Sequence, residues 1–185
     1  IDCTDHTDQN VAVMVQYAHG VSAPTGGYIG GCYDATNNRI YMAPDESSGD
    51  ATWHYIDCDD GSVVPYTHGK TDLVDDGYQG AVYDPYNDRI YFVPFNQSRE
   101  DFWHYVDCAT GNIVSYANNK GGTDDPYMGG AYSPTDNCIY FTPNVAAVNA
   151  TWTYINCYDG SVGSIFVPAG QVSASSAYQG SVYSP

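Results

Sequence analysis

Residues that favour helices are scarce in this chain of 185 residues. Leucine occurs once, at Leu73, and glutamate occurs twice, at Glu46 and Glu100, whereas tyrosine and glycine each occur 19 times. Leucine and glutamate are strong helix formers, while aromatic residues favour strands. The composition therefore predicts an all-β protein, and the length is that of one domain with a core of its own.

Positive charge is also scarce, because five Lys and Arg residues stand against 22 Asp and Glu residues, giving a formal net charge of −17. Affinity for nucleic acid or for anionic lipid requires clustered Lys and Arg, and the sequence has no such cluster. It also lacks an apolar run of about 18 residues, the length of a membrane-spanning helix. We therefore expect no nucleic-acid partner and no membrane span. Because 15% of the residues are aromatic and recur periodically, we expect a packed core rather than disorder.

Catalytic motifs are missing as well. The sequence has no G-x-S-x-G, and no pair of carboxylates stands out as the two that a glycosidase needs about 5–9.5 Å apart. The histidines recur in register, with His54 and His104 beside Trp, and with His19 and His68 in "YAHG" and "YTHG". An active site needs residues that are unique, so we expect a protein without catalytic residues.

Cysteine is present in an even number, but no two cysteines form a C-x-x-C pair. This pattern favours disulfides and an oxidising, extracellular compartment over a zinc site, although six cysteines allow 15 pairings. The six residues are Cys3, Cys32, Cys58, Cys108, Cys138 and Cys157.

A similar segment occurs three times in the chain, as "NNRIYMAPDESSGDATWHYIDC" (37–58), "NDRIYFVPFNQSREDFWHYVDC" (87–108) and "DNCIYFTPNVAAVNATWTYINC" (136–157). The tyrosines that open the units, Tyr28, Tyr78, Tyr127 and Tyr178, are 50, 49 and 51 residues apart. Repeats of this period indicate propellers, solenoids or arrays. The predicted units are 1–27 (the end of one blade), 28–77, 78–126, 127–177 and 178–185 (the start of the next blade).

Each unit contains four short strand signals, which in the second unit are "GAVYD", "RIYFVP", "WHYVDC" and "NIVSYA". They are separated by turns such as "PYND" and "ATG". Four antiparallel strands in about 50 residues make one propeller blade. The pattern "DPYNDRIYFVPF…WHYVDCATGNIVSYA" resembles the repeats of the YVTN and PQQ-like β-propeller families. The resemblance implies the blade architecture but no single function, because such repeats occur in enzymes, surface-layer proteins and adhesion modules alike.

Alternation in "WHYVDC" places Trp103, Tyr105 and Asp107 on one face of a strand, and His104, Val106 and Cys108 on the other. We interpret the repeated aromatic residues as the core between stacked blades, with a sugar-stacking platform as the alternative. These residues are Trp53, Trp103, Trp152, Tyr55, Tyr105 and Tyr154.

Two of the cysteines, Cys32 and Cys138, lie outside the repeat position that the other four share. We expect each of them to bond with a cysteine in register, so that Cys32 pairs with Cys3 or Cys58, and Cys138 pairs with Cys108 or Cys157.

Two N-glycosylation sequons, Asn96-Gln97-Ser98 and Asn149-Ala150-Thr151, lie in equivalent loops between the second and third strands. They predict N-linked glycans, with a plain polar loop as the alternative. Aspartate clusters offer weak calcium candidates, but Asp is also an ordinary turn former, so we expect solvated loops and no metal. The candidates are Asp57, Asp59, Asp75, Asp76, Asp124 and Asp125.

The chain opens with "IDC", the end of a third strand, and closes with "YQGSVYSP", the start of a unit, so it holds about 3.5–4 blades of about 50 residues each. Either it is part of a longer array or a neighbour supplies the missing strands, because an open end is a template for strand addition. We expect a secreted structural repeat protein that self-associates into a surface coat, fibre or filament, or adhesive assembly. The alternatives are a lectin-like propeller that binds glycans or other ligands, and a propeller enzyme with its active site in a missing part. No cofactor is expected.

Overall fold

The computed structural model describes residues 20–21, 26–45, 51–120, 127–144, 151–166 and 180–184, and there the chain is all-β, as predicted. One short 3₁₀ helix, η1 (Asn96–Arg99), interrupts the strands, and no helix in the described part is long and apolar enough to span a bilayer. The strands are β1 (Tyr28–Asp34), β2 (Arg39–Pro44), β3 (Thr52–Asp57), β4 (Val63–Thr67), β5 (Tyr78–Asp84), β6 (Arg89–Pro94), β7 (Phe102–Asp107), β8 (Asn112–Ala117), β9 (Tyr127–Ser133), β10 (Cys138–Pro143), β11 (Thr151–Asn156) and β12 (Val162–Phe166).

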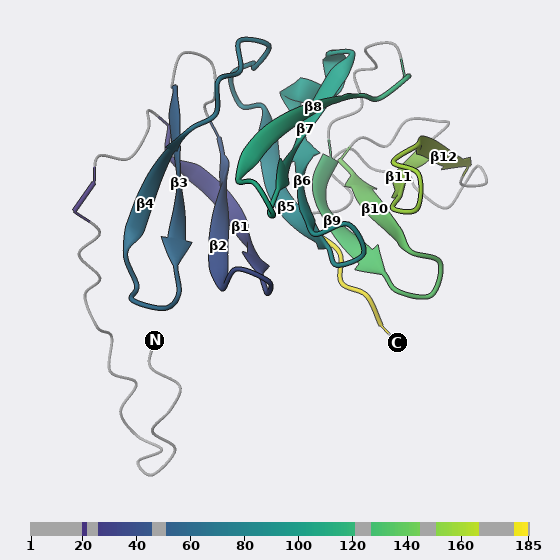
Figure 1. Cartoon of the computed structure of the whole chain (residues 1–185). Coiled ribbons are helices and arrows are strands. Elements are labelled where there is room, and N and C mark those ends of the chain that lie inside the picture. Colours follow the sequence, from purple (N-terminus) through teal and green to yellow (C-terminus); the bar gives the residue numbers. More distant parts are fainter. Residues whose placement is uncertain are drawn as a thin grey trace, which may run out of the picture.

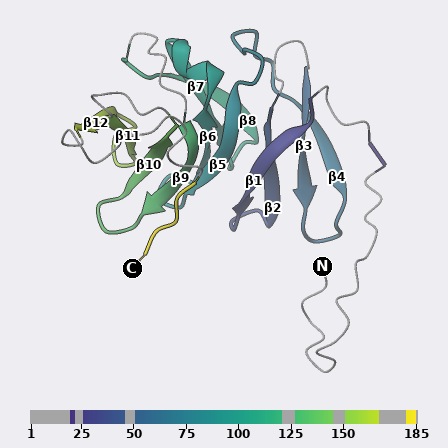
Figure 2. The same ribbon diagram turned by 180° about the vertical axis from the view of Figure 1, so that it is seen from behind.

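The strands form three four-stranded antiparallel sheets, each ordered as in the sequence. We call them blade 1 (β1–β4), blade 2 (β5–β8) and blade 3 (β9–β12). Figures 1 and 2 show the blades in chain order, with blade 2 between blades 1 and 3. The first strands β1, β5 and β9 contact one another in turn. This is an incomplete propeller-type arrangement, and the predicted fold class is confirmed.

The turn between the first and second strands has the same local cause in each blade. Asn38, Asp88 and Asn137 occupy it with φ of 51°, 55° and 54°. Asn and Asp tolerate this left-handed conformation better than other residues with a Cβ. In blade 1, Asp34 Oδ1 also accepts a hydrogen bond of 2.9 Å from the backbone N–H of Thr36, which fixes the chain reversal. Asp84 accepts the equivalent bond from the backbone N–H of Tyr86 at 2.9 Å, so the predicted turn "PYND" and its equivalent in blade 1 are Asx-type turns.

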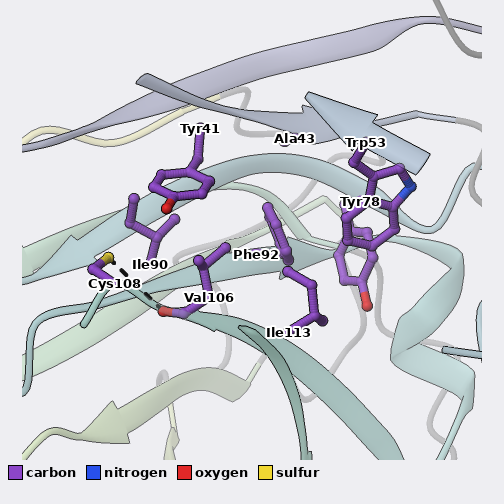
Figure 3. Packing of buried hydrophobic residues seen from close by; sticks show 9 residues of the cluster. All are labelled: Tyr41, Ala43, Trp53, Tyr78, Ile90, Phe92, Val106, Cys108 and Ile113. Atoms are coloured by element: carbon purple, nitrogen blue, oxygen red, sulfur yellow. Dashed lines mark hydrogen bonds between the residues drawn. The ribbon is translucent and has the colours of Figure 1, made fainter. Parts of the chain in front are cut away.

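The core lies between blades, in two clusters that cover the two faces of blade 2. Trp53 and Trp103 have no exposed surface and pack edge-on against Phe92 and Phe141 of the following blade, with ring centroids 5.5 and 5.9 Å apart. Trp152, on the face of blade 3 away from blade 2, is half-buried. The cluster between blades 1 and 2 contains Tyr41, Ala43, Trp53, Tyr78, Ile90, Phe92, Val106, Cys108 and Ile113 (Figure 3). The cluster between blades 2 and 3 contains Val82, Tyr91, Val93, Trp103, Tyr127, Ile139, Phe141, Ile155 and Cys157.

Residues 180–184 lie against blade 3 as the first strand of each blade lies against the blade before it. The hydroxyls of Thr135 and Tyr183 are 2.8 Å apart, and the equivalent pair in blades 1 and 2, Thr36 and Tyr83, is 3.2 Å apart. A Cβ on Gly129 (φ 146°) would lie only 2.9 Å from the Cα of Gly180, so glycine is required at this close approach. The segment therefore occupies the first-strand position of a further blade.

The predicted disulfides are not formed among the described cysteines, all five of which are free thiols. Cys32 lies on β1 and Cys58 follows β3, with β2 between them. Neighbouring strands are about 4.8 Å apart, so two strand spacings already exceed the roughly 7 Å limit between Cα atoms for a disulfide. The other possible partner of Cys32, Cys3, lies outside the described residues.

Cys138 is separated from its expected partners by the sheets themselves. Its register partner is Asn156, whereas the adjacent residues Ile139 and Cys157 face blade 2. Since side chains alternate along a strand, Cys138 faces away from blade 2. Cys108 lies farther still, on the face of blade 2 that contacts blade 1. Cys108 and Cys157 instead fill the core as small apolar side chains.

Candidate functional site: the seams between blades

We call the contact between blades 1 and 2, around Asp34, Asn37 and Cys108, the first seam, and its repeat between blades 2 and 3, around Asp84, Asn87 and Cys157, the second seam. In the first seam the amide of Asn37 donates to Asp34 Oδ2 at 2.8 Å and to the carbonyl of Cys108 at 2.9 Å. One side chain therefore joins its own turn to the next blade, and we call this arrangement the Asn latch.

The second seam repeats the latch. The amide of Asn87 donates to Asp84 Oδ2 at 2.8 Å and to the carbonyl of Cys157. Asp34 and Asp84 are both fully buried, so the latch satisfies carboxylates that would be costly to bury alone. In blade 3 the equivalent residues are Ser133 and Asp136. A carboxylate cannot donate to a carbonyl, so blade 3 does not carry the latch.

A second connection crosses the first seam through hydroxyl groups. Tyr83 donates to Asp88 Oδ1 at 2.9 Å, and the same hydroxyl lies 3.2 Å from the hydroxyl of Thr36 in blade 1. In blade 3, Tyr132 donates in the same way to Oδ1 of Asn137 at 2.7 Å. The tyrosine of each first strand thus orients the Asp or Asn of its own turn.

Three potential metal ligands meet in the first seam: Asp34, Asp88 and Cys108, whose ligand atoms all lie within 4.8 Å of one another. Burial raises the pKa of the Cys108 thiol, and the carboxylates of Asp34 and Asp88 raise it further. The thiol is therefore protonated at neutral pH. Sequence reasoning missed this cluster because it joins two repeats, and the available signal was the "D-x-x-N" in "DATN" and "DPYN".

A buried histidine lies beside the opening tyrosine in two blades. In blade 2, His104 Nε2 lies 3.2 Å from Asp72 Oδ1, and Nδ1 contacts the Tyr78 hydroxyl. A carboxylate only accepts, so Nε2 carries the proton and Tyr78 donates to Nδ1. Burial lowers the pKa of His104, although Asp72 opposes this effect. The structure therefore holds a neutral, hydrogen-bonded histidine.

The same pair occurs in blade 1, where the Tyr28 hydroxyl lies 2.5 Å from His54 Nδ1. In blade 3 the position belongs to Thr153, whose hydroxyl lies 2.6 Å from that of Tyr127. Tyr78, Tyr127 and Thr153 have no exposed surface, so solvent or a substrate does not reach these groups. The arrangement holds the first and third strands of a blade together.

The sequon at Asn96 lies in η1, against the segment that leads into blade 2. Asn96 is half-buried and its side-chain amide donates to the carbonyl of Asp75 at 3.0 Å, while Gln97 and Ser98 are buried. Gln97 donates to the carbonyl of Asp72 at 3.0 Å and so holds this segment in place. Glycosylation at Asn96 stays a prediction, and Asn149 lies outside the described residues.

The predicted calcium candidates do not gather into a site in the described part of the chain. Asp57 and Asp59 flank Cys58 in the turn after β3, where Asp59 accepts a hydrogen bond of 2.5 Å from the amide of Asn38. Asp75 and Asp76 are exposed. Asp124 and Asp125 lie outside the described residues.

The face of blade 1 that points away from blade 2 carries apolar residues at the same repeat positions as the face of blade 2 that packs against blade 1. We call it the open face of blade 1. The residues Ile90, Phe92, Val106, Ile113 and Cys108 are at most 5% exposed, whereas their equivalents Ile40, Met42, Ile56 and Val63 are half-buried and Cys58 is exposed. The difference follows from the contact with a preceding blade, which Cys108 has and which Cys58 lacks among the described residues.

No family model and no curated protein matches the sequence. Two solved structures of the extracellular domain of BT4673 from B. thetaiotaomicron, described as a one-component system and as a hybrid two-component system, share the fold with a TM-score of 0.51 each. The aligned residues are 7% identical and cover 73% and 77% of this chain. The chain spans 16% and 17% of the length of those proteins, so the similarity concerns a set of blades and establishes the fold alone.

Proposed function

We propose that this chain is a non-catalytic, extracellular repeat module that builds a surface coat, fibre or adhesive assembly by adding blades to its ends. The observation that carries the proposal is the open face of blade 1, which has the apolar pattern of two faces that pack against a preceding blade within the same chain. The added blade belongs either to further repeats of the same polypeptide or to another copy. The resemblance of the repeat to the YVTN and PQQ-like families is part of this proposal.

Two further observations support it. The described histidines are engaged in buried hydrogen bonds, as in a structural role, and residues 180–184 begin another blade against blade 3. Extracellular placement is supported by the acidic surface and by the extracellular domains that share the fold.

The test measures association directly. Sedimentation velocity over a wide range of protein concentrations should show growing species for the natural chain, and Ile56→Asp should abolish them by placing a charge on the open face. Ala109→Asp, in the exposed turn between β7 and β8, is the control and should associate normally. A chain that stays monomeric at every concentration, or that associates equally well with Ile56→Asp, would contradict assembly through this face.

A second candidate function is glycan or ligand binding, which one exposed aromatic pair supports. Tyr86 and Tyr158, from blades 2 and 3, are 60% and 64% exposed, and their ring centroids lie 5.1 Å apart. The tryptophans first considered for this role, Trp53 and Trp103, are fully buried. Binding on an oligosaccharide array that is lost with Tyr158→Ala and retained with Tyr33→Ala would support this candidate. Binding that both variants retain would exclude the pair.

A further inference from the structure

The first seam brings together three side chains that are typical metal ligands, each held at the end of a strand. Asp34 ends β1, Asp88 immediately precedes β6, and Cys108 immediately follows β7. Their carboxylate oxygens and thiol sulfur lie within 4.8 Å of one another. Asp34 and Cys108 are buried, while Asp88 is half-buried and leaves a route to solvent.

The carboxylates are already oriented by their neighbours, as metal ligands commonly are. Asp34 accepts from the backbone N–H of Thr36 at 2.9 Å and from the Asn37 amide at 2.8 Å. Asp88 accepts from the Tyr83 hydroxyl at 2.9 Å. Asp34 Oδ1 also accepts from the backbone N–H of Asn37 at 3.2 Å. Asp34 therefore keeps a lone pair on Oδ2, and Asp88 keeps lone pairs on its carboxylate that the bond from Tyr83 does not use.

A fourth group independently indicates that the cluster lacks a partner. Tyr41 is 1% exposed, and its hydroxyl makes no close hydrogen bond, although the guanidinium of Arg39 lies near enough to lower its pKa. Figure 3 shows its hydroxyl end on the side of Cys108. A buried hydroxyl without a close partner is destabilising, and a ligand in this space would offset that cost.

We propose that Asp34, Asp88 and Cys108 form a binding site for a divalent cation of the Zn²⁺ class, which links blade 1 to blade 2. Carboxylate oxygen and thiolate sulfur are both zinc ligands, and three protein ligands leave a fourth tetrahedral position for water. On binding, the S–H bond of Cys108 breaks, a bond between sulfur and metal forms, and the proton passes to solvent. The cation lowers the charge of the deprotonated cluster from −3 to −1.

The second seam provides a natural comparison within the same chain. It keeps the buried carboxylate Asp84 and the buried thiol Cys157, but Asn137 replaces the second carboxylate. Asn137 is 4% exposed, and its amide nitrogen has no hydrogen-bond partner. An amide nitrogen that points into the cluster would repel a cation, so the site belongs to the first seam.

The test uses Cd²⁺, whose bond to thiolate has an ultraviolet charge-transfer band, together with equilibrium dialysis against Zn²⁺. The natural chain is compared with Asp88→Asn and Asn137→Asp, so that binding at the exposed Cys58 cancels in the difference. Both variants suit the backbone, because Asn38, Asp88 and Asn137 share the same left-handed turn position. Circular dichroism checks that each variant is folded.

We expect Asp88→Asn to remove one equivalent of the thiolate band and to weaken binding by at least about tenfold, since even a lost outer partner of a metal ligand costs 10–100-fold. Asn137→Asp should add one equivalent at the second seam. Binding unchanged in Asp88→Asn, or a stoichiometry unchanged in Asn137→Asp, would overturn the proposal. If Asp88→Asn fails to fold, the gain expected from Asn137→Asp still decides.

Discussion

At the scale of single residues, the same repeat position behaves differently according to what lies across the seam. Cys108 and Cys157 are buried, while Cys58, which shares the local sequence "DC" with Cys108, is exposed. The sequence identified these cysteines as equivalent but predicted disulfides from their number. An even number of cysteines does not by itself indicate disulfides, because burial within a core also explains a cysteine. A repeat that places cysteine on one face of each blade also keeps the thiols apart.

His104 gives a prediction about pH. Burial lowers its pKa below the usual value near 6.5 in the unfolded chain. The unfolded state therefore binds the proton more readily, and the contribution of His104 to stability is present above about pH 6.5 and is lost as the pH falls toward the folded-state pKa. We expect the free energy of unfolding, from denaturant titrations, to decrease between pH 7.5 and pH 5.

The matched variant is His104→Thr, because Thr153 occupies this position in blade 3. It should show a smaller loss of stability over the same pH range. An equal loss in the two chains would show that other groups, not His104, cause the pH dependence.

Trp103 tests the aromatic core. It has no exposed surface and contacts Tyr116, Tyr127 and Phe141. Trp103→Ala should lower the free energy of unfolding by about 3–5 kcal/mol, as large-to-small changes in cores do. Phe102→Ala is the control. Phe102 precedes Trp103 but is 48% exposed, and changes at the surface alter the free energy of unfolding by only about 0.5 kcal/mol. A loss below about 1 kcal/mol for Trp103→Ala would place that ring outside the core.

At the scale of elements, strand positions and faces could be predicted from the sequence, but contacts between repeats could not. Alternation in "WHYVDC" assigned Trp103 and Tyr105 to one face and Val106 and Cys108 to the other, and the two core clusters confirm this assignment. The Asn latch was missed because it joins residues 71 positions apart in different repeats. The turn pattern indicates the backbone conformation of these residues, but it does not show which groups their side-chain amides contact.

The latch leads to a prediction at this scale. Asn37→Ala removes both amide hydrogen bonds and leaves a buried carboxylate oxygen and a carbonyl without their donor. The free energy of unfolding should decrease by about 1–3 kcal/mol. Asn112→Ala, at an exposed position of β8, should change it by no more than about 0.5 kcal/mol. Equal effects of the two variants in denaturant titrations would show that the latch contributes no stability.

At the scale of the whole molecule, stability depends on contacts between consecutive blades. Each blade is a sheet with two apolar faces, so a blade alone would expose at least one of them, and a stack buries all but the outermost. The repeat period predicted this architecture, because four strand signals in about 50 residues leave few alternatives. The number of blades in the complete assembly depends on the angle between blades, which a repeat pattern does not encode.

The central claim is that one repeat position is buried wherever a blade precedes it and accessible where none does. Site-resolved alkylation of the native chain, at a concentration at which sedimentation shows monomers, tests it most directly. Cys58 should react rapidly, while Cys108 and Cys157 should react only after denaturant unfolds the seams. Equal rates for the three cysteines, or a protected Cys58 in the monomer, would contradict the stacking of blades described above.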